Sequence, residues 1–545
     1  MGYFVQRAGA VFLLFAIVSG ACQSTATAPG PKATEGPVDP RLTTLAYGVP
    51  TEPGSFDPHT NVTIVGGYRF YPAIYETLIR YGVDGSLQPM LAESWSTPDS
   101  GKTYRFKLRS GVKFSDGTPF NTQAVADALS RMRTLNKGAV ALFAPIESVK
   151  PVDDLSFDLI MKQPFAPILA TLAGWQGAMF ISPAAVKAND KGGDLAQAWL
   201  NDHTAGTGPF MLESWERNAR IVFVRNPHYR VPVAPADLQR IVMPTVKEAG
   251  TLRQQLAAGD LDMVEELTPA VIDALRQTSG VKVNLDAIQG SVYGQHIVLN
   301  LTKKPFDNVN FRRAIAYAVD YKRLVTVWNG VAEQAQGPLL PTFSPWFSAK
   351  DAVQYQQDSS KVAEELRKAG HTMPISPRLK FNFIWQSGQS AQRDMALLIK
   401  EDLSKIGIDM EVQEVELPVW REAIWKHTFE MAHSQQSLRY SDPDAYATLY
   451  SHSSEWRDGG FNPGIRDPKM DELVRTASST IDPAARRTLY NDWQRRMTED
   501  VMILYLVNKK QAWANGTNVS GLTWNPNYGP MFDFTQVRKT AVRGR

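Results

Sequence analysis

The sequence of 545 residues contains one cysteine, Cys22. A chain with a single thiol cannot form an internal disulfide, so its hydrophobic core alone must hold the fold, and this length allows a sizeable core. An excess of charge is also absent, since 58 Lys and Arg stand against 55 Asp and Glu and no basic run occurs. This balance gives no argument for a nucleic-acid partner.

Long hydrophobic runs are absent too. The longest early run, 8–18, is shorter than the roughly 20 residues that a transmembrane helix needs. Arg7 is the only charge before Cys22, and the small residues 19–21 directly precede the cysteine. A basic start, a short apolar stretch and small residues at the cleavage point predict a secretory signal peptide over 1–21.

The surroundings of Cys22 resemble a bacterial lipobox, although Ser19 stands where lipoboxes usually carry leucine. In a lipobox the cysteine thiol is acylated and becomes the mature N-terminus; the alternative is a chance cysteine beside an ordinary cleavage site. The following stretch, to residue 40, has Val38 as its only large apolar side chain and cannot pack a core. We therefore expect a lipidated cysteine with a flexible tether at 22–40. The protein is expected in the periplasm or at the outer face of the cell membrane.

Catalytic signatures are scarce. The glycine-rich stretch 205–210 lacks a third glycine, and Pro209 removes an N–H that a phosphate would need, so a tight turn between domains is the better interpretation. No Gly-x-Ser-x-Gly motif occurs, and the eight histidines are scattered. His427 and His433 are six residues apart and cannot share one helix face toward a metal. We expect no catalysis, metal or cofactor, although a glycosidase-type carboxylate pair stays open.

Local patterns indicate a mixed α/β chain. The alternation of apolar and charged residues predicts a strand over 103–108, and Asn121 is a typical N-cap for the helix that follows. Another helix is predicted between Asp358, as its cap, and Gly370, as its end.

The next predicted helix ends at Gly407 and is followed at once by an alternating strand over 408–413. A helix and a strand separated by one residue are typical of α/β domains.

Several stretches resemble family 5 extracellular solute-binding proteins, the dipeptide-, oligopeptide- and nickel-binding class of ABC importers. The most distinctive is "YRFKLRSGVKFSDGTPFNTQAVADAL" at 104–129. Weaker stretches follow the family's order along the chain, at 52–59, 74–81, 87–95, 206–215, 225–229, 256–264, 299–320, 361–370, 398–412 and 441–446. The ordered set covers nearly the whole mature chain.

The resemblance implies an α/β, periplasmic-binding-protein-like fold of two lobes with an extra third domain and a cleft that closes on a hinge. Lobe I would be discontinuous, over 41–73, 205–288 and 516–545. The extra domain would cover 74–204, and lobe II would cover 289–515. The implied function is that of a monomeric substrate-binding lipoprotein, which captures peptides or peptide-like solutes and delivers them to an ABC permease in the cytoplasmic membrane.

One position departs from the peptide-binding members. These proteins commonly carry an aspartate, four residues before the proline of the "DPD" turn, that receives the α-ammonium group of the peptide. Here Arg439 takes its place, and an arginine prefers a carboxylate or phosphate. Opine-like, sugar-phosphate or other anionic solutes therefore stay open, as do nickel and haem. Alternatively, Arg439 points to solvent or pairs with Asp442 or Asp444.

Further ligand candidates are aromatic or lie near Arg439. They are Trp385, Trp420, Ser437 and Tyr440, together with Thr63 and Val65 in the loop 61–67. For each aromatic residue, core packing is an equal alternative. A surface adhesin, a chaperone or a sensory accessory on the same scaffold, or an enzyme built on it, are the alternatives from other functional classes.

Overall fold

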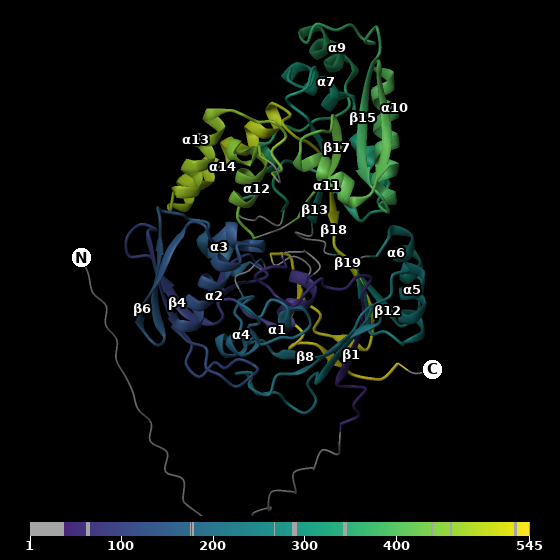
Figure 1. Ribbon diagram of the computed structural model, residues 1–545. Helices are drawn as coiled ribbons and strands as arrows, with labels where there is room; N and C mark the ends of the chain where they lie inside the picture. The colour runs from purple at the N-terminus through teal and green to yellow at the C-terminus, as the bar shows by residue number, and fades with distance from the viewer. Residues whose placement is uncertain are drawn as a thin grey trace, which may run out of the picture. The chain divides into compact units, whose positions relative to one another are not determined.

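The computed structural model describes residues 38–61, 66–174, 176, 179–265, 267–285, 291–341, 346–437, 440–457, 460–527 and 531–543 (Figure 1). The chain divides into two units, Met1–Val38 and Asp39–Arg545, and every element named below belongs to the second. Within the described residues, no helix has both the length and the apolar character that crossing a membrane requires.

A seven-stranded sheet is built from the beginning, the middle and the end of the chain. Its spatial order is β12 (Val281–Leu285), β19 (Ala512–Gly516), β11 (Met263–Glu265), β1 (Thr44–Gly48), β10 (Arg240–Pro244), β9 (Arg220–Arg225) and β8 (Phe210–Glu216). Strand β1 is parallel to β10 and β11, and the other pairs are antiparallel.

The two faces of this sheet differ because successive side chains of a strand point to opposite sides. Val264 and Ala514 belong to the same core cluster as the apolar residues of α5 (Ala249–Ala258) and α6 (Pro269–Arg276). Met263 and Trp513, the strand neighbours of Val264 and Ala514, lie instead in a second, aromatic cluster together with Tyr47.

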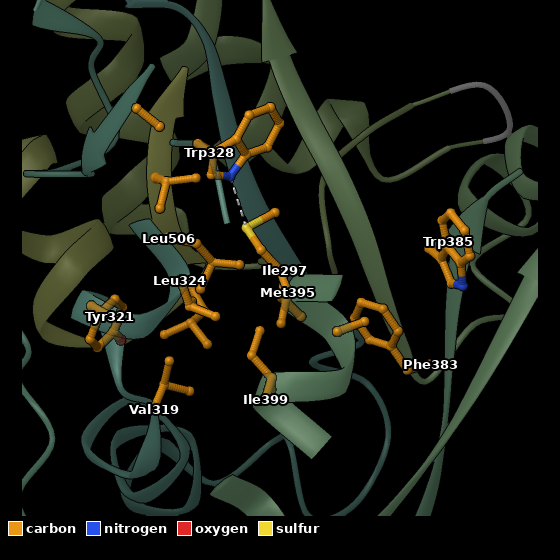
Figure 2. Packing of buried hydrophobic residues seen from close by; sticks show 14 of the residues in the cluster. Ile297, Val319, Tyr321, Leu324, Trp328, Phe383, Trp385, Met395, Ile399 and Leu506 are labelled. Atoms are coloured by element: carbon orange, nitrogen blue, oxygen red, sulfur yellow. Dashed lines mark hydrogen bonds between the residues drawn. The ribbon is translucent and has the colours of Figure 1, made fainter. Parts of the chain in front are cut away.

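A six-stranded sheet comes from the stretch 291–510. Its order is β14 (Ala332–Gln334), β18 (Leu504–Lys510), β13 (Ser291–Leu299), β17 (Met431–Ser437), β15 (Leu379–Gln386) and β16 (Ile408–Val415). Helices with side chains in one of its core clusters are α7 (Val309–Ala318), α8 (Tyr321–Thr326), α9 (Ser359–Lys368) and α10 (Ser390–Lys405). Figure 2 shows part of this cluster, with Trp328 Nε1 donating to Met395 Sδ at 3.4 Å.

A further cluster contains side chains of α11 (Leu417–Trp425), α12 (Asp444–Ser451), α13 (Pro468–Ser479) and α14 (Pro483–Glu499). Ile297 and Leu299 of β13 pack in the cluster shown in Figure 2, whereas Val298 between them packs in the cluster of α11 to α14. The sheet is therefore apolar on both faces, and a layer of helices covers each.

A four-stranded sheet in the order β4 (Ala92–Ser96), β5 (Thr103–Leu108), β7 (Ser156–Met161) and β6 (Ile146–Asp153) has its own core cluster. Helices α2 (Thr122–Leu135) and α3 (Ile168–Ala173) pack into it. The predicted strand over 103–108 is confirmed as β5, since Tyr104, Phe106 and Leu108 are buried.

Shorter elements complete the chain. They are the hairpin β2 (Ile79–Tyr81) with β3 (Leu87–Pro89), the pair β20 (Val519–Ser520) with β23 (Arg538–Lys539), and the pair β21 (Trp524–Asn525) with β22 (Met531–Phe532). The short helices are α1 (Tyr71–Ile74) and α4 (Pro183–Asn189). A π-helical turn, Gly66–Phe70, precedes α1.

Several helix ends lie where the sequence predicts them. The Asn121 side chain caps α2 by accepting from Ala124 N at 3.1 Å, and Asp358 caps α9 through Ser360 N. Gly370 and Gly407 follow α9 and α10 with φ of 83° and 89°, a conformation that glycine adopts without steric cost.

Two connections join the seven-stranded and six-stranded sheets. Figure 1 shows β18 continuing into β19, and Gln511 alone separates them. The other connection runs from β12 to β13 through 286–290, outside the described residues. At this connection, the backbone torsions of a single residue, Gln511, lie between a strand of one sheet and a strand of the other.

Candidate functional site

The loop after β17 meets two distant parts of the chain at what we call the β17 junction. The Ser441 backbone N–H donates to Tyr81 Oη at 3.1 Å, and Ser441 Oγ donates to Asn527 Oδ1 at 3.0 Å. Asn527 Nδ2 also donates to Gly82 O at 3.2 Å, and Asn525 Nδ2 donates to Tyr81 O at 2.9 Å. The junction thus joins the loop after β17 to the β2–β3 hairpin and to the C-terminal segment.

A buried ion pair holds the loop in place. Arg486 of α14 donates from both terminal nitrogens to the carboxylate oxygens of Asp442, at 2.6 and 2.7 Å. Arg486 Nε donates to Ala477 O, and Asp442 Oδ1 also accepts from Asp444 N. Asp442, which the sequence left open as a partner of Arg439, is therefore bound by Arg486, with the bidentate geometry that arginine favours.

Within the described residues, the side chain of the second acid, Asp444 at the start of α12, has only hydroxyl partners. Tyr440 Oη donates to Asp444 Oδ2 at 3.2 Å, and Thr448 Oγ1 donates to Oδ1 at 3.1 Å. Burial raises the pKa of Asp444 to about 6, helped by the negative charge of Asp442. Tyr440, a predicted ligand residue, is a buried member of the core cluster of the four-stranded sheet.

The predicted tryptophans lie on the six-stranded side. Trp385, near the end of β15, is buried in the cluster of Figure 2. Trp420 of α11 is half-buried, and its Nε1 donates to His433 O at 2.9 Å. Ser437 ends β17 opposite Tyr293 of β13. The structure thus brings Ser437 and Tyr440 to the two ends of one short loop, whereas both tryptophans pack against cores.

Four other predicted residues lie outside the described residues. They are Cys22, Thr63, Val65 and Arg439. Their proposed roles rest on the sequence.

A polar cluster on β17, buried except for Gln435, was not predicted. His433 Nε2 donates to Gln295 Oε1 at 2.8 Å, and Gln295 Nε2 donates to Gln435 Oε1 at 3.1 Å. Gln392 of α10 donates to Gln295 Oε1 at 3.3 Å. Burial lowers the pKa of His433 to about 3, so the cluster carries no charge at neutral pH. The sequence feature that could have predicted this cluster is the run of polar residues in the strand 431–437.

The seven-stranded sheet contributes a second unpredicted group, at the carboxyl end of β11. Arg69 forms a fully buried ion pair with Glu265 and donates from Nη1 to Thr51 Oγ1 at 3.0 Å. Trp513 stacks on Trp524, with ring centroids 5.9 Å apart. Both indole N–H groups are buried and have no hydrogen-bond partner among the residues that the structure describes. Buried donors of this kind are normally satisfied, so these two could serve a ligand oxygen.

The described residues hold no group of three or more His, Cys, Asp or Glu side chains placed to bind a metal. The 205–210 stretch is a close backbone contact, because a side chain at Gly206 or Gly208 would meet the carbonyl oxygen of Ile74. Gly208 N donates to that oxygen at 2.8 Å. The glycines therefore serve packing, as expected for a tight turn.

The family model described as bacterial extracellular solute-binding proteins, family 5, matches residues 86–458. The chain belongs to this family. Family 5 comprises solute-binding proteins, so the geometry above is that of a binding protein.

Relatives extend the similarity over the chain. The chain is 28% identical over 501 residues to the "Probable D,D-dipeptide-binding periplasmic protein DdpA" of Escherichia coli K12, covering 91% of this chain and 94% of that protein. It is 27% identical over 477 residues to the "Glutathione-binding protein GsiB" of E. coli O6:K15:H31, covering 85% and 88%.

Among solved structures, the periplasmic binding protein DppA of Helicobacter pylori in complex with the peptide STSA superposes with a TM-score of 0.78. It is 22% identical to this chain, and the match covers 91% of this chain and 98% of DppA. The α/β, periplasmic-binding-protein-like two-lobe fold expected from the sequence is confirmed.

Proposed function

We propose that this solute-binding protein captures peptides or peptide-like solutes between its lobes and delivers them to the permease of an ABC importer. The observation that carries the proposal is the β17 junction, where Ser441 connects the six-stranded side to Tyr81 and Asn527. A loop that contacts both the β2–β3 hairpin and the C-terminal segment is well placed to couple ligand contact to closure of the lobes.

The ligand class follows from the chemistry of the loop. Asp442 is neutralised by Arg486, and Asp444 is buried with a raised pKa, so neither offers a free carboxylate to an α-ammonium group. Arg439 would instead bind a carboxylate. The named ligands of the two relatives, a D,D-dipeptide and glutathione, are small peptides that depart from ordinary α-linked L-peptides. We propose such peptide-like solutes, with Ser437, Trp420, Thr63 and Val65 as further contacts, whereas Trp385 and Tyr440 are buried in core clusters.

The domain boundaries belong to the same proposal. Lobe I over 41–73, 205–288 and 516–545 accounts for the seven-stranded sheet except 512–515 of β19, which pair with β11 and β12 although the boundary leaves them in lobe II. The extra domain, 74–204, accounts for the four-stranded sheet, and lobe II, 289–515, for the six-stranded sheet. Closure would turn about Gln511, which alone separates β18 from β19. The protein would act as a monomer, without catalysis, anchored to the membrane through lipidated Cys22.

The test is to purify the chain without residues 1–22 and to identify co-purified solutes by native mass spectrometry. The same preparation is then screened for thermal stabilisation by free peptides, N-acetylated peptides and anionic solutes. A ligand at 100 times its Kd should stabilise the folded state by about 2.7 kcal/mol. No stabilisation by any peptide or peptide-like solute would overturn the proposal.

A variant tests the role of Arg439. Arg439→Ala should weaken binding of a carboxylate ligand by roughly tenfold to a hundredfold, the effect of losing a charge-assisted hydrogen bond. The control is Arg457→Ala, which removes an exposed arginine ion-paired with Glu455 and should leave binding unchanged. A bound peptide that requires its α-ammonium group and is indifferent to Arg439→Ala would show that the arginine is peripheral.

A further inference from the structure

A cavity of about 700 Å³ lies beside the β2–β3 hairpin, and we call it the hairpin cavity. Its volume is within the range typical of small-molecule sites. Its lining comes mainly from the hairpin, from 229–231 and from the C-terminal segment, and includes Arg80, Tyr81, Arg109, Val231, Phe532 and Asp533. Within the described part of the chain, none of the lining residues comes from 291–511, and the six-stranded side touches the cavity wall through the bond from Ser441 N to Tyr81 Oη.

Hydrogen bonds fix the walls of the cavity against each other. Asn525 of β21 donates to Tyr81 O at 2.9 Å, and Tyr81 Oη donates to Ala170 O at 3.1 Å. Tyr81 thereby ties the hairpin to the C-terminal segment on one side and to α3 on the other. The cavity is therefore a built feature of the fold.

The charges in the lining favour an anion. Glu76 is buried and accepts from Arg230 at both carboxylate oxygens, so this pair is neutral overall. Arg80 and Arg109 have no ion-pair partner among the described residues, and Arg109 uses only its Nε, on Met90 O at 2.5 Å. Their guanidinium groups remain available for bidentate contact with a carboxylate or sulfonate.

Asp533 is the remaining acid of the lining. Its Oδ1 already accepts from Thr535 N at 3.0 Å and from the Thr535 hydroxyl. The two unpaired arginines outnumber it, so the net field of the lining is positive.

Part of the remaining lining is apolar. Phe532, Phe534 and Tyr229 contribute aromatic surface. Val83 and Val231, at 53% and 51% exposed, are among the most exposed large apolar residues of the described chain, and both line this cavity. Exposed apolar residues gathered at a cavity are typical of a binding site rather than of bare surface.

We propose that the hairpin cavity is a second ligand site, separate from the site between the lobes, which binds an amphipathic organic anion. The acidic group contacts Arg80 and Arg109, and the aromatic or branched apolar body lies against Phe532, Phe534 and Val231. This inference does not depend on the identity of the transported solute.

The test is a fluorescence titration of the soluble chain with 8-anilinonaphthalene-1-sulfonate, an amphipathic aromatic sulfonate. We expect binding at about one site per chain. Arg109→Gln and Val231→Glu should each weaken binding by about tenfold or more, because the first removes a cation and the second puts a repelling charge among the apolar contacts. Val231 is exposed, so its substitution should leave the fold intact, which thermal unfolding verifies.

The matched control lies on α11, whose Leu417, Val419 and Trp425 are also exposed and whose Arg421 lies over the Trp425 ring. Arg421→Gln should change affinity by no more than about twofold. A saturating peptide ligand should not displace the probe. The proposal is overturned if both cavity variants bind as the unmodified chain does, if Arg421→Gln abolishes binding, or if the peptide competes. A failure of peptide binding with intact probe binding would overturn only the proposed transport function.

Discussion

Asp442 and Asp444 stand two residues apart after β17, and their carboxyl groups have different hydrogen-bond partners. Asp442 receives two hydrogen bonds from Arg486, whereas among the described residues the side chain of Asp444 receives bonds only from the hydroxyls of Tyr440 and Thr448. A buried carboxyl without a cation of its own favours its neutral form, and the pKa of Asp444 is accordingly raised. The loop therefore contains a group that titrates near physiological pH.

Asp444→Asn should remove a pH dependence of stability. The pKa of Asp444 rises from 3.8 to about 6 on folding, so its contribution is fully present below pH 4 and is lost as pH rises through 6. The stability of the unmodified chain relative to Asp444→Asn should fall by roughly 3 kcal/mol over this interval, from about 1.4 kcal/mol per pKa unit. Urea denaturation of both proteins between pH 4 and 7 measures the difference.

The buried histidines titrate in the same range and are common to both proteins, so their effect cancels in the comparison. Burial lowers the pKa of His59 to about 4 and those of His296 and His433 to about 3. Asp492→Asn, at an exposed position of α14, serves as the control substitution. Parallel stability curves for the unmodified chain and Asp444→Asn would show that Asp444 ionises normally.

At the scale of the element, two glycines follow consecutive helices of the chain, and the space around their Cα atoms differs. Gly370 after α9 has open space where a Cβ would be, whereas a Cβ at Gly407 after α10 would lie 2.5 Å from both Ile375 N and Ile375 O. Both residues have positive φ. The backbone requirement is the same at the two positions, and only the contact differs.

Gly407→Ala should therefore destabilise the fold more than Gly370→Ala. A non-glycine residue in the left-handed region costs about 1–2 kcal/mol, and this should be the whole effect at Gly370. At Gly407 the overlap with Ile375 should add about 1–3 kcal/mol, as overpacking usually does. Chemical denaturation of the two variants gives the comparison. Equal losses would mean that the segment carrying Ile375 moves aside at no cost.

At the scale of the whole molecule, two sheets of different origin are joined where β18 passes into β19 at Gln511. The first unit, Met1–Val38, precedes them and contains the only cysteine. A binding protein that serves a membrane permease gains from attachment, because a tether raises the local concentration of its partner.

Cys22→Ser should move the protein from the membrane fraction to the soluble fraction and leave ligand binding unchanged. Without acyl chains the protein loses its anchor, and the serine hydroxyl cannot be lipidated by the thiol route. Cell fractionation followed by ligand titration checks both halves of this prediction. Thr27→Ala, which changes the tether and keeps the cysteine, should remain with the membrane. Persistent membrane attachment of Cys22→Ser would contradict the lipobox interpretation.

Local structure was predictable from the sequence because its causes are local. The alternation in β5, the cap at Asn121 and the stop at Gly370 depend on neighbours within a few residues, and all three are confirmed. The ordered stretches that resemble family 5 identified the family for the same reason, since each is a short run of residues.

The candidate site was less predictable, since its contacts join residues far apart in the sequence. Asp442 and Arg486 are separated by 44 positions, Arg69 and Glu265 by 196, and Ser441 and Tyr81 by 360. Nothing in the local pattern of Asp442 distinguishes a buried partner of Arg486 from a surface charge. Trp385 and Tyr440 likewise read as ligand contacts or as core, and only their packing shows them buried here.

The sequence by itself determined the family, the α/β class and the ends of helices, because side-chain periodicity and capping act over a few residues. The tertiary structure alone decided which charges are paired, which rings are core, and where a cavity remains beside the hairpin. Those outcomes depend on which distant surfaces are buried together. Burial sets both the strength of an ion pair and the pKa of a carboxyl.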